Sequence, residues 1–134
     1  MRFSAHLRNK SDDHRVSLKA GEKEQLLSFP SKPTGGSSVS GGELLFLALA
    51  TCYCNDIYRE AARRAIKVES VEVEVDGDFE AEGKPASNII YRAKVHADAS
   101  EDQIRQLMMH TDTVAEIQNT LRLGVPVRLE FMTA

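Results

Sequence analysis

Residues 42–52 read Gly-Glu-Leu-Leu-Phe-Leu-Ala-Leu-Ala-Thr-Cys, a run that is apolar almost all round a helix. Ser40 and Glu43 have the Ser-x-x-Glu spacing of a capping box, which marks a helix N-terminus. No proline or glycine follows before about Ile66, so the pattern predicts one helix of about 25 residues, about 37 Å long. A first half that is apolar on every side must be surrounded. A chain of 134 residues has little material for this, so we expect a second subunit to supply part of it.

Upstream of this helix, apolar and polar residues alternate in three short runs. The alternating apolar positions are Phe3, Ala5, Leu7, Val16, Leu18, Ala20, Leu27 and Phe29. Period-two alternation broken by Asp12-Asp13 and Gly21-Glu22 predicts a three-stranded meander. Residues 30–42 are rich in Pro, Gly and Ser and predict a loop, without the Lys-Ser/Thr of a phosphate-binding motif.

Downstream, two longer alternating runs predict a hairpin of half-buried strands. Their apolar positions are Val71, Val73, Val75, Tyr91, Ala93, Val95 and Ala97. If the strands pair, Glu72 and Glu74 lie near Arg92 and Lys94 on the outer face, a cross-strand arrangement worth about 0.2–1 kcal/mol per pair. These charges therefore support the hairpin and do not indicate a binding site.

The last third of the chain predicts two helices and a strand. Ser100 and Gln103 form a second capping box, and Thr113 and Glu116 a third, after a break near Thr111. Gly124 has the place of a helix C-terminal glycine. Alternation at Val125, Val127, Leu129 and Phe131 then predicts a final strand. The whole order, β-β-β, long helix, β-β, two helices and β, predicts an α+β fold and a single domain over residues 1–134.

Composition excludes several classes of protein. The formal net charge is −3, and no Lys/Arg cluster is present, so we expect no nucleic acid partner. The longest apolar run, Leu44 to Ala50, is far below the roughly 20 residues that cross a bilayer, and residues 1–4 lack a secretory signal, so we expect a cytoplasmic protein without a membrane partner. The four histidines have no metal-ligand spacing, so we expect no metal and no cofactor.

The stretch Gly42-Glu43-Leu44-Leu45-Phe46-Leu47-Ala48-Leu49-Ala50-Thr51-Cys52 resembles the central-helix signature of the OsmC/Ohr family. Residues 118–127, Gln-Asn-Thr-Leu-Arg-Leu-Gly-Val-Pro-Val, are similar to its C-terminal helix and following strand. The resemblance covers essentially the whole chain in order of elements. It implies an OsmC-like fold, with antiparallel sheets around a long central helix, and an intertwined homodimer.

The same resemblance implies chemistry at Cys52. Members of the family reduce organic hydroperoxides with a peroxidatic cysteine at this position, and a resolving cysteine in the C-terminal helix then forms a disulfide with it. Here the resolving position falls on Ala115, and neither of the two cysteines lies outside the central helix. The carboxylate that helps hold an arginine near the thiol falls on Gly42, with Glu43 one residue later.

An arginine is the expected thiolate stabiliser, because Cys52 lies about nine residues inside its helix and a helix dipole acts only over the first turn. The resemblance implies that it comes from the N-terminal hairpins. Arg15 is our choice by position, with Arg8 and Arg2 as alternatives.

Cys52 and Cys54 do not form a redox pair. Residues two apart point about 200° apart around a helix, so their sulfur atoms cannot meet without breaking it. A free cysteine in an apolar run is often a small buried hydrophobe, which is also our interpretation of Cys54. Glu43 is explained by its capping box, with a catalytic role as the alternative.

The sequence thus favours a thiol-dependent antioxidant peroxidase of oxidative-stress defence. It would reduce organic hydroperoxides through Cys52, with Arg15 as thiolate stabiliser, Glu43 as orienting group and an external thiol as reductant. The alternative is a non-catalytic dimer on the same fold that holds a small apolar ligand. A thioesterase-like fold is disfavoured, because helices interrupt the strands before the last one.

Overall fold

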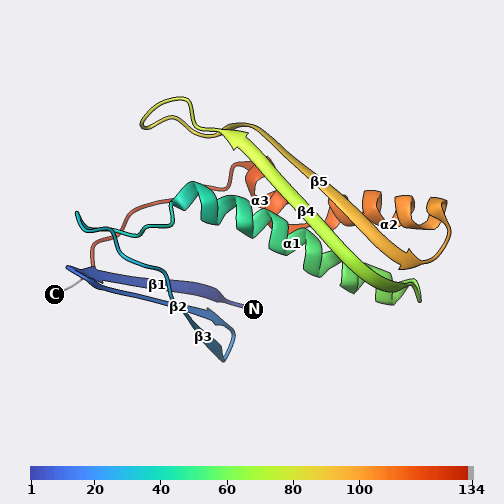
Figure 1. Cartoon of the computed structure of the whole chain (residues 1–134), viewed down its shortest axis with the longest axis horizontal. Helices are drawn as coiled ribbons and strands as arrows, with labels where there is room; N and C mark the ends of the chain where they lie inside the picture. Colours follow the sequence, from blue (N-terminus) through green and yellow to red (C-terminus); the bar gives the residue numbers. More distant parts are fainter. Residues whose placement is uncertain (133–134) are drawn as a thin grey trace. The chain divides into compact units, whose positions relative to one another are not determined.

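The computed structural model describes residues 1–132. The chain forms two compact units, Met1–Leu44 and Leu45–Ala134. The elements run β-β-β, long helix, β-β and two helices (Figure 1), and both sheets are antiparallel. The predicted α+β class is therefore confirmed, whereas a single domain over 1–134 stays a prediction.

The first unit contains the predicted meander. Strands β1 (Phe3–Lys10), β2 (Asp13–Ala20) and β3 (Lys23–Leu27) pair antiparallel in chain order. The register places Arg8 directly opposite Arg15. The loop that follows is tied back to the sheet, since the Asn9 side chain accepts from the Gly36 amide at 3.1 Å and donates to the Gly36 carbonyl at 3.4 Å.

Helix α1 (Gly41–Arg63) begins where its capping box predicts. The Ser40 amide donates to Glu43 Oε2 at 2.7 Å, and the Glu43 amide donates to Ser40 Oγ at 3.1 Å. The helix ends before the predicted Ile66, because Ala65 adopts a left-handed conformation with φ of 53°. From Leu45 onward, α1 is part of the second unit.

The hairpin of β4 (Lys67–Asp78) and β5 (Ser87–Asp98) pairs in the predicted register, with Glu72 opposite Lys94 and Glu74 opposite Arg92. Only the first pair makes its ion pair, at 3.9 Å, because Arg92 bonds instead to Asp76 at 2.8 Å. Gly77 lies where the register shifts. A Cβ there would come within 2.8 Å of Phe46 Cζ, so a larger residue would displace the Phe46 ring.

Helix α2 (Glu101–Val114) has the predicted capping box of Ser100 and Gln103. The predicted break near Thr111 is wrong, because α2 continues to Val114 and the chain turns at Ala115, whose φ and ψ are −73° and 110°. The capping box expected at Thr113 is also absent, since Thr113 Oγ1 donates to the His110 carbonyl. Helix α3 (Glu116–Leu123) ends at Gly124, with φ of 62°, as expected.

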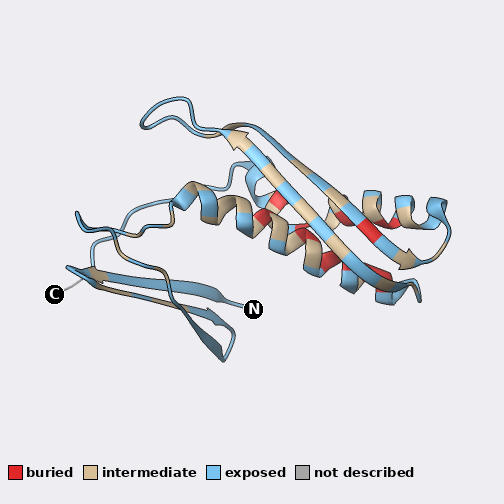
Figure 2. Ribbon diagram, viewed as in Figure 1, coloured by how far each residue is buried: buried red, intermediate tan, exposed pale blue. Residues whose placement is uncertain are grey.

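The core of the second unit lies along one face of α1 (Figure 2). Its buried members are Tyr53, Ile57 and Ala61 from α1, Val95 from β5 and Leu107 from α2. Apolar residues of both strands of the hairpin pack around them. Helix α1, which carries Cys52, therefore packs in one core with the β4–β5 hairpin and α2.

The predicted final strand does not form within one chain. Residues 125–132 form no strand, and Val127, Leu129 and Phe131 are 96%, 82% and 91% exposed. A strand needs a partner to satisfy its backbone, and no strand of the described residues pairs with this segment. The first half of α1 is incompletely enclosed by this chain, with Leu47 58% exposed, and the expected contribution of a second subunit stays a prediction.

Leu107→Ala should destabilise the protein by about 2–5 kcal/mol, because it leaves a cavity around a side chain with no exposed surface. Met109→Ala is the matched control on the same helix, where 67% of the residue is exposed, and should change the free energy of unfolding by less than about 0.5 kcal/mol. Urea denaturation followed by circular dichroism measures both. Equal effects would contradict the assigned core.

Candidate functional site

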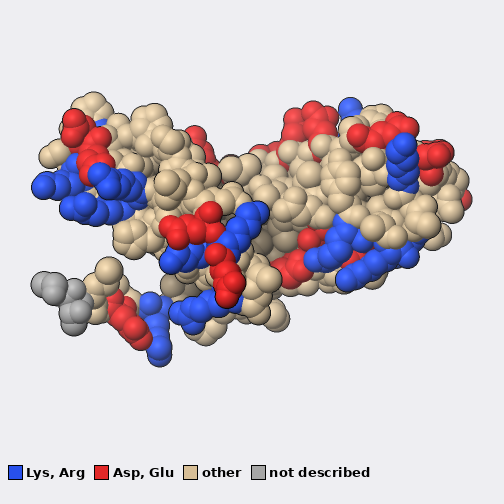
Figure 3. Space-filling view, turned by 90° about the horizontal axis from the view of Figure 1, so that it is seen from below, with Lys and Arg blue, Asp and Glu red and all other residues tan. Residues whose placement is uncertain are grey.

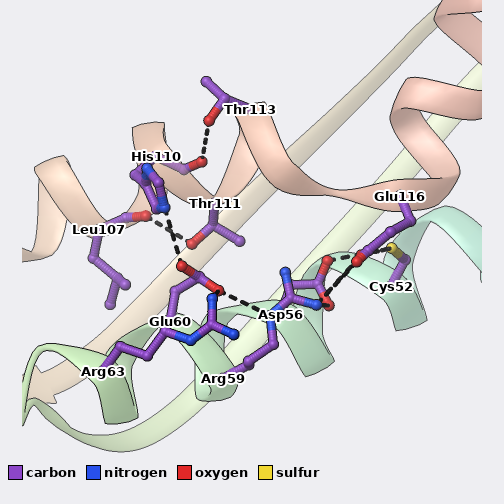
Figure 4. Close-up of polar contacts among 10 residues, drawn as sticks. All are labelled: Cys52, Asp56, Arg59, Glu60, Arg63, Leu107, His110, Thr111, Thr113 and Glu116. Carbon is purple, nitrogen blue, oxygen red and sulfur yellow. Dashed lines mark hydrogen bonds and ion pairs between the residues drawn. The ribbon is translucent and has the colours of Figure 1, made fainter.

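Cys52 lies half-buried on α1, with two carboxyl groups and a backbone amide around its sulfur. Its Sγ is 3.6 Å from Asp56 Oδ2, one turn along the same helix, and 4.0 Å from Glu116 Oε1 of α3 (Figure 4). The backbone amide of Ile117, in the first turn of α3 (Glu116–Leu123), lowers the pKa of the thiol. The thiol can donate to Asp56.

The Ile117 amide is free because it belongs to the first turn of α3. The first amides of a helix have no partner within it, and the residue before α3, Ala115, has no side chain to cap them. The effect of this amide on the pKa of Cys52 therefore comes from the N-terminus of α3 and not from that of α1, which is too distant.

Buried contacts fix α3 in this position. Gln118 Nε2 donates to the Leu49 carbonyl of α1 at 3.1 Å, and Ala115 is fully buried. At the end of α2, the Asp112 carboxylate accepts from Tyr91 of β5 and, at 2.7 Å, from Arg122 of α3. These bonds join α3 to α1, α2 and the hairpin.

Arg59 joins the carboxyl groups near the thiol. Its guanidinium lies 3.1 Å from Asp56 Oδ1, 2.9 Å from Glu116 Oε2 and 2.8 Å from Glu60 Oε2. Glu60, which is only 3% exposed, also pairs with Arg63 at 2.9 Å and with His110 at 3.0 Å. One network of charges therefore extends from Cys52 to α2 (Figure 4).

These surroundings favour the neutral thiol. Burial raises the pKa of Cys52 above its ordinary value, and the negative charges of Asp56 and Glu116 raise it further, while the Ile117 amide opposes them. Burial and the hydrogen bond with Glu116 raise the pKa of Asp56 to about 6. The same bond, together with Arg59, lowers the pKa of Glu116. The pKa values of the two carboxyl groups therefore move in opposite directions.

Of the residues predicted from sequence, Arg15 and Glu43 belong to the first unit and Cys52 to the second. Arg15 lies on β2 in the first unit, where its side chain is 72% exposed and pairs with Asp13 at 3.0 Å. Its role at the thiol stays a prediction, as does that of Arg8 opposite it. Glu43 accepts from the Ser40 amide, which lowers the pKa of its carboxyl group and agrees with its capping role. Cys54 faces away from Cys52 and lines a hollow with Val71 and Val73.

Three atoms of the kinds that bind metal ions lie close together at the site. Cys52 Sγ and one oxygen each of Asp56 and Glu116 lie within 4.8 Å of one another. The guanidinium of Arg59 already pairs with both carboxyl groups and supplies the positive charge that a metal ion would bring. The expectation that the protein holds no metal stays a prediction.

Sequence reasoning missed Asp56, Arg59 and Glu116. Asp56 follows Cys52 by four residues and Arg59 follows Asp56 by three, the spacings at which side chains meet on a helix, so this signal was available. Glu116 had a weaker signal, its place beside Ala115 at the expected resolving position. Nothing in the sequence places the free amide of Ile117 against the sulfur, because this depends on tertiary packing.

Comparison with known proteins shows the family and the fold of this chain. The model of the family described as OsmC-like protein matches residues 34–130, and the chain therefore belongs to that family. A search of curated proteins found no match. An OsmC-like protein from Mycoplasma pneumoniae has a similar structure, with a TM-score of 0.63 and 18% identity over 90% of this chain and 86% of its own.

Two further solved structures show the same fold. An OsmC-like protein of unknown function from Vibrio cholerae has a TM-score of 0.61 and 16% identity, over 90% of this chain and 93% of its own. An organic hydroperoxide resistance protein from the same organism, described as a putative one with captopril bound in one of its active sites, has a TM-score of 0.54 and 22% identity, over 91% and 85%. At these identities the likeness establishes the fold.

The charged surface is mixed. Basic and acidic side chains are interspersed over the visible face (Figure 3), and the ion pairs include Arg92 with Asp76 and Lys94 with Glu72. Among residues 1–132, no helix combines the length and apolar character needed to cross a bilayer.

Asp56→Asn should stabilise the protein at neutral pH. The folded-state pKa of Asp56, about 6, lies above its ordinary value of 3.8, so the ionised carboxylate opposes folding as the pH rises between them. The gain in free energy of unfolding over the wild type should be absent below about pH 4, grow to about pH 6 and then stay constant. Urea denaturation at a series of pH values measures it.

Glu60→Gln is the control of opposite sign. The hydrogen bond from Arg59 lowers the folded-state pKa of Glu60, so its carboxylate stabilises the fold above the unfolded pKa of about 4.3 and stops doing so as the pH falls through the folded value. This variant should lose stability at neutral pH. An Asp56→Asn effect that does not change with pH would contradict the charge assignment.

Proposed function

We propose that the chain is a thiol-dependent peroxidase that reduces organic hydroperoxides through Cys52. The observation that carries this proposal is the position of the thiol, half-buried and 3.6 Å from the carboxyl group of Asp56, with its pKa lowered by the α3 amide of Ile117. Membership of the OsmC-like family supports it, as does the likeness in fold to proteins described as organic hydroperoxide resistance proteins.

Reaction needs a thiolate, and the charges near Cys52 in the second unit disfavour one. Arg15 remains our predicted source of positive charge, with Arg8 and Arg2 as alternatives. Glu43 is the predicted orienting group, although its capping box explains it without catalysis. The amide of Ile117 is a fixed donor that favours the thiolate within the second unit itself.

The cycle that we propose uses one cysteine. Attack of Cys52 sulfur on the hydroperoxide forms an S–O bond and breaks the O–O bond, which gives cysteine sulfenic acid and an alcohol. Ala115 occupies the resolving position and is fully buried. An external thiol therefore condenses with the sulfenic acid and releases water, and a second thiol reduces the mixed disulfide. A reducing cytoplasm, our predicted location, supplies such thiols.

We also propose that the active form is an intertwined homodimer. The exposed Leu47 on α1 and the alternating, unpaired segment 125–132 are apolar surfaces that one chain leaves to solvent. A second copy supplies a matching pair of such surfaces, and two-fold interfaces are self-complementary. This accounts for the apolar run of the central helix and for the strand that does not form within one chain.

One observation favours the rival function, a binding protein without turnover. An open hollow of about 260 Å³ lies beside α1. It is lined by Ala50, Thr51, Cys54, Asn55, Val71 and Val73. The hollow is mainly apolar, and the raised pKa of Cys52 is what an unreactive thiol would also show. A small apolar ligand held there would need no chemistry at Cys52.

The peroxidase proposal predicts rapid, selective oxidation of Cys52. Reduced protein should form sulfenic acid at Cys52 faster with cumene hydroperoxide than with hydrogen peroxide, as the likeness to organic hydroperoxide resistance proteins leads us to expect. Mass spectrometry with a sulfenic acid trap measures both rates. Cys54→Ser should keep the reaction and Cys52→Ser should abolish it. A Cys52 no faster than free cysteine would leave the binding protein as the better account.

The dimer proposal predicts a mass near twice 14.9 kDa by light scattering. Leu47→Asp should shift the protein toward the monomer, because it places a charge on the proposed contact. Met109→Asp, at a similarly exposed apolar position on α2, should leave the mass unchanged. A wild-type monomer at micromolar concentration would contradict the proposal.

A further inference from the structure

We propose that Asp56 is a catalytic residue of this reaction, which takes the proton of the Cys52 thiol during attack and passes it to the departing alkoxide. Glu116 and Arg59 are its positioning residues. The inference rests on the proposed peroxidase function and names the group that manages its proton.

The two carboxyl oxygens of Asp56 have different partners. Oδ2 accepts from the Cys52 thiol at 3.6 Å, and Oδ1 is held by Arg59 at 3.1 Å. Asp56 is 6% exposed, and its place one turn from Cys52 on α1 fixes the two side chains on one face. Glu116 is farther from the sulfur, at 4.0 Å, and its side chain is 59% exposed. Asp56 is therefore the better acceptor.

Counting charges shows why a proton acceptor is needed. The groups that face Asp56 are the Cys52 thiol and Arg59 from α1 and Glu116 from α3, and behind Arg59 lies Glu60, neutralised by Arg63 and partnered by His110. A thiolate formed by losing its proton to water would add a third negative charge against one guanidinium. Transfer of that proton to Asp56 leaves the local charge unchanged.

Asp56 also suits the second half of the transfer. Its pKa of about 6 means that the carboxylate is mostly ionised at neutral pH and can accept a proton, yet holds it more readily than an ordinary aspartate. The thiol loses its proton to Oδ2 as sulfur bonds to the terminal peroxide oxygen. The O–O bond breaks, the sulfur is oxidised by two electrons, and the alkoxide takes the proton from Oδ2 to leave as alcohol. Asp56 ends ionised, as it began.

The test compares two reactions of Cys52 in full-length protein carrying Cys54→Ser, so that one thiol reports. Iodoacetamide alkylates the thiolate and needs no proton returned, whereas cumene hydroperoxide needs both steps. Asp56→Asn removes a negative charge beside the thiol, so alkylation at pH 7.5 should become faster. Oxidation should become at least about 100-fold slower, because general acid–base catalysis is lost. The two rates thus move in opposite directions.

Glu116→Gln and Asp56→Glu are the matched variants. Glu116→Gln removes a charge that positions Asp56 but does not take the proton, so it should slow oxidation less than Asp56→Asn does. Asp56→Glu keeps the carboxylate and should recover part of the oxidation rate lost in Asp56→Asn. Circular dichroism and urea denaturation confirm that each variant is folded.

The parent protein gives a second reading that needs no Asp56 variant. Its oxidation rate should rise with a midpoint near pH 6, as Asp56 ionises, and then level off, while alkylation continues to rise as the thiol ionises at higher pH. Oxidation that follows alkylation across the whole range would overturn the inference. A folded Asp56→Asn variant that oxidises as fast as a rapidly reacting parent would also overturn the role of Asp56. The proposed peroxidase function would remain. A parent no faster than free cysteine overturns both.

Discussion

The site depends on the packing of the first turn of α3 against the middle of α1. Gln118 joins this turn to the Leu49 carbonyl through a buried hydrogen bond. The chain changes direction at Ala115, between α2 and α3, so the free amides of the first turn of α3 face α1. The Ile117 amide then meets the sulfur of Cys52, and Glu116 approaches Asp56. If α2 continued unbroken into α3, neither contact could form, because the amides would be used within the helix.

The groups around Cys52 have opposing effects on the pKa of its thiol. Burial and two carboxyl groups favour the protonated sulfur, while one backbone amide and a shared guanidinium limit the cost of charge nearby. Such a balance suits a thiol that remains neutral at rest and loses its proton only during reaction. It also connects the fold to the chemistry, since the residues that set the balance come from α1 and α3 and are aligned by the core around Ile57 and Leu107.

Periodicity and capping predicted most of the secondary structure. The capping boxes at Ser40 and Ser100 located two helix starts, and alternation gave the hairpin register in which Glu72 faces Lys94. Errors arose where tertiary contacts decide the outcome. Val125 begins a segment whose alternation predicts a strand, but a strand needs a neighbour that one chain does not provide.

At the site, sequence alone singled out Cys52 and missed its partners. Asp56 could have been found from helical spacing, whereas Ile117 and Glu116 meet the sulfur only because the chain turns at Ala115, a residue with no capping side chain to signal the turn. Arg15, chosen by resemblance, belongs to the other unit and remains a prediction.

The most direct test of this account is amide hydrogen exchange at Ile117, followed by nuclear magnetic resonance in reduced protein and in Cys52→Ala. The Ile117 amide lowers the pKa of Cys52 and has no partner within α3, so we predict that it donates to the sulfur, with protection in the reduced wild type and faster exchange in the variant. An Ile117 amide that exchanges equally fast in both proteins would show that α3 does not hold its N-terminus on the thiol, and the account of the site would be wrong.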